Sequence, residues 1–232
     1  MPNKLADCFD GLEKASGVDE EIARVKARPK RCYLLCFTPR SGSSWVSELL
    51  IGTNVLGRPL EWINPHFVRR NAEAFGCNNI HDYLYLLLAK RSSPDGVFGM
   101  EASFFQLNLL RSLVDPFSIL GDRTRVFYLW RKDFVLQGIS LYKATASGLF
   151  HAHSDGEAAE IRARHDAIPY DVEKIKFWIL HIMQQEFGFQ RFFCEQDIKP
   201  PCFVYEEIRQ QPDCMVRRIA RAMGVASGLE VE

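Results

Sequence analysis

The chain has 232 residues, enough for one large α/β domain and too few for two complete domains. Hydrophobic residues make up 47% of it and charged residues 25%, the composition of an ordinary folded, soluble protein. Lys+Arg and Asp+Glu both total 29, so the chain has no overall basic field that would draw it to nucleic acid or to a membrane surface. Any anion-binding site must therefore be local.

Residues 1–30 form a polar, charged lead-in in which DEEIARVKAR (19–28) favours a short helix. They contain no apolar segment of the kind that a signal peptide needs, and the most apolar run, YLYLLLA (83–89), is far too short to span a membrane. The seven cysteines are scattered without a CxxC pair, which argues against a zinc site and against a disulfide framework. We therefore expect a cytoplasmic protein with no integral membrane segment and a single domain over residues 31–232.

Strands and helices are predicted to alternate along this domain. The apolar run CYLLCF (32–37) and the run TRVFYLW (124–130) predict strands buried on both faces. Shorter strands are expected at GVFGME and at PPCFVYEE. Helices are expected over residues 43–52, 78–91, 104–114, 134–146, 169–194 and 212–224, and a surface loop or lid over 151–168. This alternation predicts a P-loop-like α/β fold of three layers, α/β/α, with a central, mainly parallel sheet.

The segment TPRSGSSWV (38–46) directly follows the first buried strand. A helix that begins here presents unpaired amides and the positive end of its dipole, which together bind anions. Gly42 lets a ligand approach the backbone closely, and Arg40 adds a guanidinium suited to an oxyanion. The segment lacks the lysine of the GxxxxGK[ST] motif, which disfavours a kinase or NTPase. On spacing alone, a plain serine-capped turn is an equally good interpretation.

A second segment, WRKDFVLQGIS, has the same architecture as the first. Arg131 follows the strand over 124–130, and Ser140 lies nine positions later on the next helix. Ligands of open parallel sheets bind where strand ends and helix starts of neighbouring units face one another. Taken alone, Arg131 favours a solvated residue at a helix start and Ser140 an ordinary helical serine, but together with the first segment they indicate one ligand with two anionic ends.

In this order the motifs resemble sulfotransferases that use 3′-phosphoadenosine 5′-phosphosulfate (PAPS). TPRSGSSW resembles their 5′-phosphosulfate loop, where the cytosolic enzymes have a lysine at the position of Arg40, and RKDFVLQGISLYKA resembles their 3′-phosphate segment. The bacterial carbohydrate group, which includes trehalose, nodulation and lipopolysaccharide sulfotransferases, is also similar at GRPLEW (57–62), GVFGME (96–101) and VYEEI (204–208). The resemblance extends over residues 33–224, most of the chain.

The resemblance implies a role for each of these residues. The residues that would hold PAPS are Arg40, Ser41, Gly42, Ser43, Ser44, Trp45, Arg131 and Ser140. Glu61 would be the general base that takes the proton of an acceptor hydroxyl, while Arg40 would stabilise charge on the bridging oxygen. A carbohydrate or glycolipid acceptor would lie beside Glu61, near Trp62, His66 and Phe67, and no metal is required.

The sequence departs from the group in two places. Glu101 stands where a member of the group has a lysine, and a carboxylate near an anionic donor changes the electrostatics of the site. The printed sequence also ends soon after residue 224, where members of the group usually continue with a basic segment. A PAPS-binding protein without transferase activity is therefore the alternative function, and a kinase a more distant one. A homodimer is also consistent with the resemblance.

Overall fold

A computed structural model of the protein describes residues 4–27, 31–150 and 163–225. Within them, the elements in chain order are η1 (Asp7–Phe9), α1 (Val18–Lys26), β1 (Arg31–Phe37), α2 (Ser43–Gly52), α3 (Pro65–Phe75), α4 (Ile80–Arg91), β2 (Val97–Ser103), α5 (Phe104–Arg111), α6 (Pro116–Leu120), β3 (Arg125–Trp130), α7 (Phe134–Ser147), α9 (Val172–Glu195), β4 (Cys202–Val204), α10 (Tyr205–Ile208) and α11 (Pro212–Ala222).

The four strands of the described sheet are all parallel and lie in the order β2-β1-β3-β4. Phe37, the last residue of β1, pairs with Ser103 at the end of β2 and with Leu129 near the end of β3. The carboxyl ends of these three strands therefore reach the same edge of the sheet, where ligands of open α/β folds bind. The chain crosses from β1 to β2 on one side and then from β2 past β1 to β3 on the other, so β1 lies between β2 and β3.

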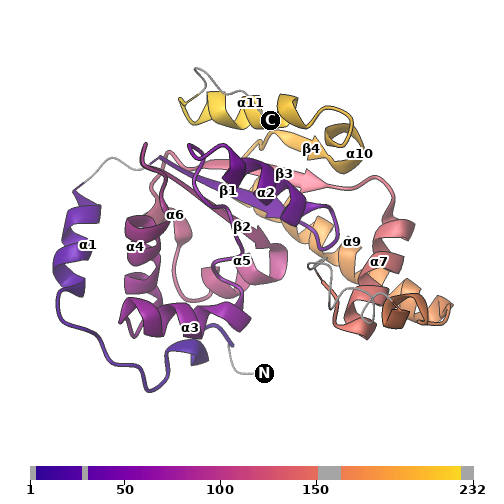
Figure 1. The fold of residues 1–232 in the computed structure, drawn as a ribbon, viewed down its shortest axis with the longest axis horizontal. Helices are drawn as coiled ribbons and strands as arrows, with labels where there is room; N and C mark the ends of the chain where they lie inside the picture. The colour runs from indigo at the N-terminus through magenta and orange to yellow at the C-terminus, as the bar shows by residue number, and fades with distance from the viewer. Residues whose placement is uncertain (1–3, 28–30, 151–162, 226–232) are drawn as a thin grey trace.

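Helices cover both faces of the sheet, as the side chains of β1 show by pointing alternately to one face and the other. Leu34 packs into a core formed with α3, α4 and α9, whereas its neighbour Leu35 packs into a second core formed with α2 and α11. Figure 1 shows α2 and α11 on the opposite side of the strands from α4 and α5. The prediction of a three-layer α/β/α fold with a parallel sheet is confirmed.

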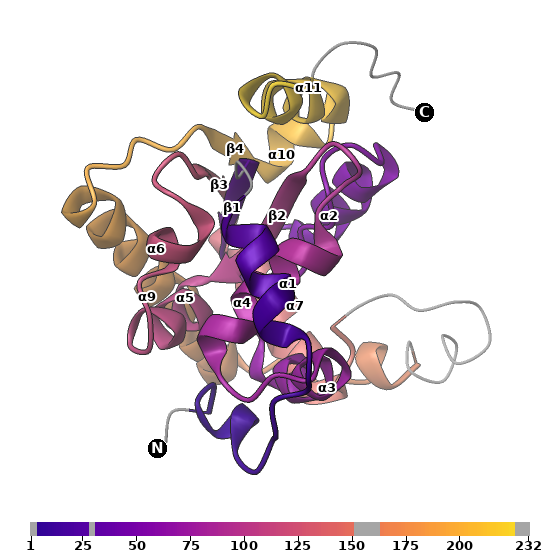
Figure 2. The same cartoon turned by 90° about the vertical axis from the view of Figure 1, so that its left-hand side faces the viewer.

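Residues 4–27 pack onto the larger of these cores. Leu5 and Phe9 are buried against α3 and α4, and Ile22 buries the inner face of α1. Figure 2 shows α1 lying alongside α4. Lys90 of α4 pairs with Glu21 of α1 at 3.1 Å. The helix expected over 19–28 is thus present, and its apolar side is part of the protein interior.

Most predicted elements are present, but three local features differ from the expectation. The strand expected at PPCFVYEE is limited to β4, and α10 begins at Tyr205. Helix α3, which the sequence analysis did not predict, begins where Asn64 accepts a hydrogen bond from the backbone of His66 and Pro65 occupies the first turn. Asp115 and Pro116 begin the short helix α6 in addition to following α5. Residues 151–162 of the expected loop or lid lie outside the described residues. In the described part of the chain, no helix is both long enough and apolar enough to cross a membrane.

Candidate active site

The loop between β1 and α2 has the backbone conformation that an anion cradle needs. Arg40 has a φ of 64° and Gly42 a φ of 89°, both in the left-handed region, while the Ser41 N–H donates to the Thr38 carbonyl at 3.1 Å. Gly42 is the N-cap of α2 and supplies no side-chain oxygen to its first turn. The first amides of α2 therefore lie at the carboxyl edge of the sheet with the positive end of the helix dipole.

Gly42 is also required because Tyr205 lies directly against it. A Cβ at position 42 would come within 2.5 Å of Cδ2 of Tyr205, the first residue of α10. The guanidinium of Arg131 lies 4.9 Å from the centre of the same ring. The chain that follows β4 thus closes one side of the loop, and the tyrosine ring bridges the two segments that the sequence predicted to bind anions.

Those two segments are in direct contact. Nε of Arg40 donates to Oγ of Ser140 on α7 at 2.9 Å, and Nη1 of Arg131 donates to the carbonyl oxygen of Arg40 at 3.4 Å. Burial first, and then the positive charge of Arg131, lower the pKa of Arg40 below its usual range. Two guanidinium groups held this close favour an anion between or beside them. Glu206, 3.6 Å from Nε of Arg131, offsets part of the charge.

One polar atom of the loop is left without a partner. Oγ of Ser41 is fully buried and forms no hydrogen bond within the described residues. A buried hydroxyl without a partner loses about 1–3 kcal/mol of solvation. A phosphate or sulfate oxygen in the cradle would supply the missing acceptor, so the residues present fit an anionic ligand. Ser43 is also buried, whereas Ser44 and Trp45 are half-buried in the first turn of α2.

Gln137 and Thr38 support the loop from below, and the sequence analysis missed both. Nε2 of Gln137, a fully buried side chain on α7, donates to Oγ1 of Thr38 at 3.0 Å and to the Pro39 carbonyl at 2.7 Å. The hydroxyl of Tyr128 on β3 donates to Glu186 of α9, whose carboxyl has a pKa raised by burial. The available signal was a glutamine that lies one turn before Ser140 and directly follows the apolar residues Phe134–Leu136.

Glu61, the predicted base, lies in the loop before α3 and is held by two amide side chains. Its Oε2 accepts hydrogen bonds from Nδ2 of Asn64 at 2.9 Å and from Nε2 of Gln106. Gln106 is itself fixed, because it forms a capping box with Ser103 at the start of α5, immediately after β2. Glu61 is therefore positioned at the carboxyl end of the sheet by residues of two different elements. Sequence reasoning did not find Asn64 or Gln106.

The predicted acceptor residues lie in different environments. Trp62 is only 8% exposed, its indole N–H donates to the Arg58 carbonyl at 2.8 Å, and the guanidinium of Arg91 lies 5.2 Å from its ring. His66 and Phe67 are exposed in the first turn of α3, Phe67 to 52%. Of the three, His66 and Phe67 are accessible to a ligand, whereas Trp62 packs in the core beneath Glu61.

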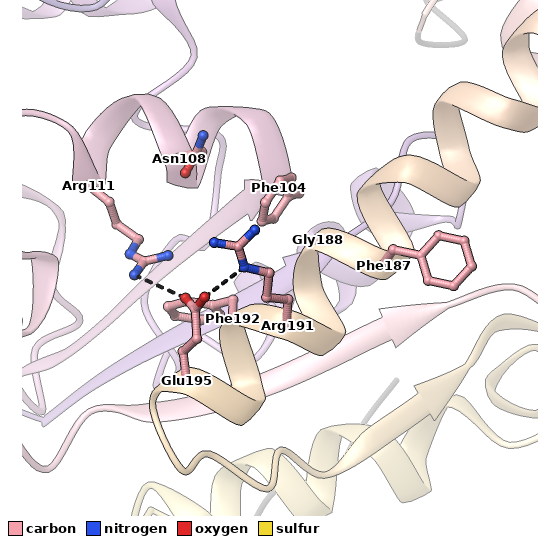
Figure 3. Close-up of a pocket in the computed structure, with 8 residues that line it drawn as sticks. All are labelled: Phe104, Asn108, Arg111, Phe187, Gly188, Arg191, Phe192 and Glu195. Atoms are coloured by element: carbon pink, nitrogen blue, oxygen red, sulfur yellow. Dashed lines mark hydrogen bonds and ion pairs between the residues drawn. The ribbon is translucent and has the colours of Figure 1, made fainter.

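Two other features of the described residues bear on the chemistry. His165 lies 3.4 Å from Asp166, and the described chain contains no group of three or more His, Cys, Asp or Glu residues that could hold a metal ion. A surface pocket of about 410 Å³ lies between α5 and α9, where Glu195 reaches both Arg191 (2.7 Å) and Arg111 (3.9 Å) (Figure 3). Its charges are paired with one another, and none of its lining residues belongs to the anion loop.

Comparison with known proteins identifies the family. The family model described as Stf0 sulphotransferase matches residues 32–230. The chain belongs to the Stf0 sulphotransferase family. Trehalose 2-sulfotransferase of Mycobacterium tuberculosis (strain ATCC 35801 / TMC 107 / Erdman) is 23% identical over 235 residues, which cover 85% of this chain and 86% of the relative. Membership of the Stf0 sulphotransferase family supports sulfuryl transfer as the class of reaction, and the loop and Glu61 lie within the matched residues.

Proposed function

We propose that this Stf0 sulphotransferase moves the sulfuryl group of PAPS to a hydroxyl of a carbohydrate or glycolipid. The observation that carries the proposal is the contact between Arg40 and Ser140, with Arg131 beside them. It joins the end of β1 to the end of β3 in one cation-rich cradle. PAPS has charge at both ends, the 5′ phosphosulfate and the 3′ phosphate, and so matches a site with two adjoining anion-binding segments.

Each segment then has its own part of the donor. The 5′ phosphosulfate would bind the hydroxyls and amides around Gly42, with Ser41, Ser43 and Ser44, in a P-loop-like manner, and Arg40 beside it. The 3′ phosphate would bind Arg131 and Ser140. The half-buried ring of Trp45 is the candidate to pack on adenine. The buried, unpaired hydroxyl of Ser41 supports this placement, because a donor oxygen would satisfy it.

The reaction would be an in-line displacement at sulfur. The acceptor oxygen forms a new S–O bond while the bond between sulfur and the bridging phosphate oxygen breaks, so negative charge grows on the departing phosphate. Arg40 and the amides of the loop would stabilise that charge. Glu61 would take the acceptor's proton. Both amide donors of Glu61 bind its Oε2. Its other oxygen, Oε1, accepts no hydrogen bond from the described residues, and we assign proton transfer to that oxygen.

The acceptor would lie in front of Glu61, against His66 and Phe67, where a sugar could stack and hydrogen-bond. We assign Trp62 to the packing that holds the Glu61 loop. The name of the relative, a trehalose sulfotransferase, supports a carbohydrate acceptor. A cytoplasmic location is supported by the seven free cysteines, which suit a reducing compartment, and a homodimer remains part of the proposal.

The direct experiment supplies ³⁵S-labelled PAPS with a panel of glycans and glycolipids that includes trehalose. The proposal expects label in a sugar product that forms only with enzyme. Binding of 3′-phosphoadenosine 5′-phosphate (PAP) without any sulfated product would instead favour a nucleotide-binding paralogue without transferase activity. Label transfer from [γ-³²P]ATP, with none from PAPS, would favour the kinase interpretation and contradict the proposal.

A further inference from the structure

Glu101 is a buried carboxyl beside the candidate base, and the proposed reaction gives it no role. It lies on β2 opposite Leu35 of β1 and is 3% exposed. Its backbone N–H donates to the carbonyl oxygen of Leu60 at 3.1 Å, and Leu60 precedes Glu61 in the chain. The strand position of Glu101 therefore holds the loop that carries Glu61.

The side chain of Glu101 reaches the same loop through Ser47 of α2. Oγ of Ser47, a buried hydroxyl, lies 2.6 Å from the carbonyl oxygen of Pro59 and 3.0 Å from Oε2 of Glu101. A hydroxyl has one hydrogen and a carbonyl can only accept, so the shorter contact takes that hydrogen. The contact with Glu101 is then a full hydrogen bond only if the carboxyl supplies the hydrogen, which requires an uncharged carboxyl.

The charges around Glu101 favour the same protonation state. Burial first, and then the negative charge of Glu61, raise the pKa of Glu101 to about 8. Tyr33 of β1 faces it as well, and burial together with the charge of Glu101 raises the pKa of that phenol. Among the described residues, Glu61 and Tyr33 are the titratable groups that interact with Glu101, and neither brings a positive charge.

We propose that Glu101 is a positioning residue that acts as an uncharged hydrogen-bond donor, coupling α2 and its anion loop to the loop that carries Glu61. The inference rests on the proposed function, because that function assigns the PAPS donor to the anion loop before α2 and the acceptor to the loop that carries Glu61. When Glu101 releases its proton to solvent, the contact with Ser47 loses its hydrogen and a second negative charge adjoins Glu61. Sulfuryl transfer therefore falls as Glu101 ionises.

The first test compares wild type with Glu101→Gln, whose amide can donate to Ser47 but cannot ionise. Turnover of labelled PAPS with the acceptor from the glycan panel is measured from pH 6 to 10. Wild type should lose turnover along an alkaline limb, whereas Glu101→Gln should stay within about threefold of wild type at pH 7 and lack that limb. Glu101→Leu, which cannot donate, should lose more than tenfold in kcat with KM little changed. Glu48→Gln is the matched control, because it removes the charge of an exposed side chain next to Ser47, and it should keep the wild-type dependence of turnover on pH.

A second measurement does not depend on activity. A carboxyl whose pKa is higher in the folded than in the unfolded chain stabilises the fold below its unfolded value and loses that contribution as pH rises through its folded value. The melting temperature of wild type relative to Glu101→Gln should therefore fall between about pH 5 and pH 8 and then level off. If Glu101→Gln does not fold, Ser47→Ala is the substitute. It should lower kcat about tenfold at pH 7 and leave a smaller alkaline limb, because the contact that ionisation of Glu101 would weaken is already absent and only the charge beside Glu61 still changes.

The outcomes separate this inference from the proposed function. If the wild type turns over and its pH profile coincides with that of Glu101→Gln, the positioning role is refuted and the proposed reaction stands. If the difference in melting temperature between wild type and Glu101→Gln does not change with pH, the proposal that the Glu101 carboxyl is uncharged is refuted. Expected melting curves without turnover of any acceptor would refute the proposed reaction, and the positioning role with it, but would leave the neutral carboxyl supported.

Discussion

Nε of Arg40 donates to Oγ of Ser140 at 2.9 Å although 100 residues separate them in the chain. The contact exists because β1 and β3 are neighbours in the sheet and end at the same edge, so the loop after β1 meets the helix after β3. The two segments form one site because of this topology. The function that we propose for this site, binding of PAPS through its 5′ phosphosulfate and its 3′ phosphate, can be tested at both ends of the ligand.

Removal of the Arg131 guanidinium tests the proposed binding site of the 3′ phosphate. Hydrogen bonds to a charged group contribute about 1.5–3 kcal/mol, so Arg131→Met should weaken PAP binding by about 10- to 100-fold. Ser140→Ala removes a neutral donor and should weaken it by no more than about tenfold. Calorimetric titration gives both affinities, and a denaturant curve shows whether each variant is folded. Equal, unchanged affinities would contradict the placement of the 3′ phosphate.

Gly42→Ala tests the backbone of the anion loop. The added Cβ would meet Tyr205 at 2.5 Å and would occupy a φ of 89°, so we expect a loss of about 1–3 kcal/mol in the free energy of unfolding and a loss of PAP binding. Gly52→Ala is the matched control, because Gly52 ends the same helix with nothing within 4 Å of the new Cβ. That variant should be neutral or more stable by up to about 1 kcal/mol. Urea unfolding of both variants decides the prediction.

Gln137→Leu tests the support beneath the loop. The substitution leaves the Thr38 hydroxyl and the Pro39 carbonyl without their buried donor, which should reduce the free energy of unfolding by about 1–3 kcal/mol. Gln190→Leu, an exposed glutamine on α9, should change it by less than about 0.5 kcal/mol. If the two variants unfold at the same denaturant concentration, Gln137 does not hold the loop.

Glu61→Gln tests the proposed base. The amide keeps the size of the side chain but cannot take a proton, so kcat should fall by roughly 10²- to 10⁴-fold while PAP binding changes little. Glu73→Gln removes a half-exposed carboxylate from α3 and should leave turnover unchanged. The comparison is made by label transfer from PAPS at saturating acceptor. Full turnover by Glu61→Gln would exclude its role as the base.

The cysteines give a test of the fold that needs no substrate. Cys194, Cys202 and Cys214 are exposed, whereas the other four are buried, and burial raises the pKa of the Cys36 thiol. A thiol reagent should therefore label three cysteines quickly in the native protein, with Cys202 the slowest of these because partial burial raises its pKa. The remaining thiols should react only after unfolding. Rapid native labelling of Cys36 would contradict a central position for β1.

Local sequence signals were sufficient for most of the fold. The apolar runs at β1 and β3 are short, continuous and bounded by turn residues, so they indicated buried parallel strands directly. Asp133 caps α7 and Asn79 caps α4, each directly before the helical run that the sequence predicted. Helix α3 was missed because its signal, Asn64 followed by Pro65, is also typical of a loop.

The candidate site was predictable only in part. Arg40, Arg131 and Ser140 stand in recognisable segments, and a parallel sheet brings such segments to one edge. Gln137, Thr38, Asn64 and Gln106 are single polar residues whose partners lie far away in sequence, so no local pattern singles them out. Their roles depend on tertiary contacts such as the one between Gln106 and Glu61.

The most direct test of the two-ended cradle is a calorimetric titration of the wild-type protein with PAP and, under the same conditions, with adenosine 5′-phosphate. The two ligands differ only in the 3′ phosphate, which is assigned to Arg131 and Ser140. PAP should bind with one site per chain and at least about tenfold more tightly than adenosine 5′-phosphate. Equal affinities, or no heat with PAP, would contradict the account.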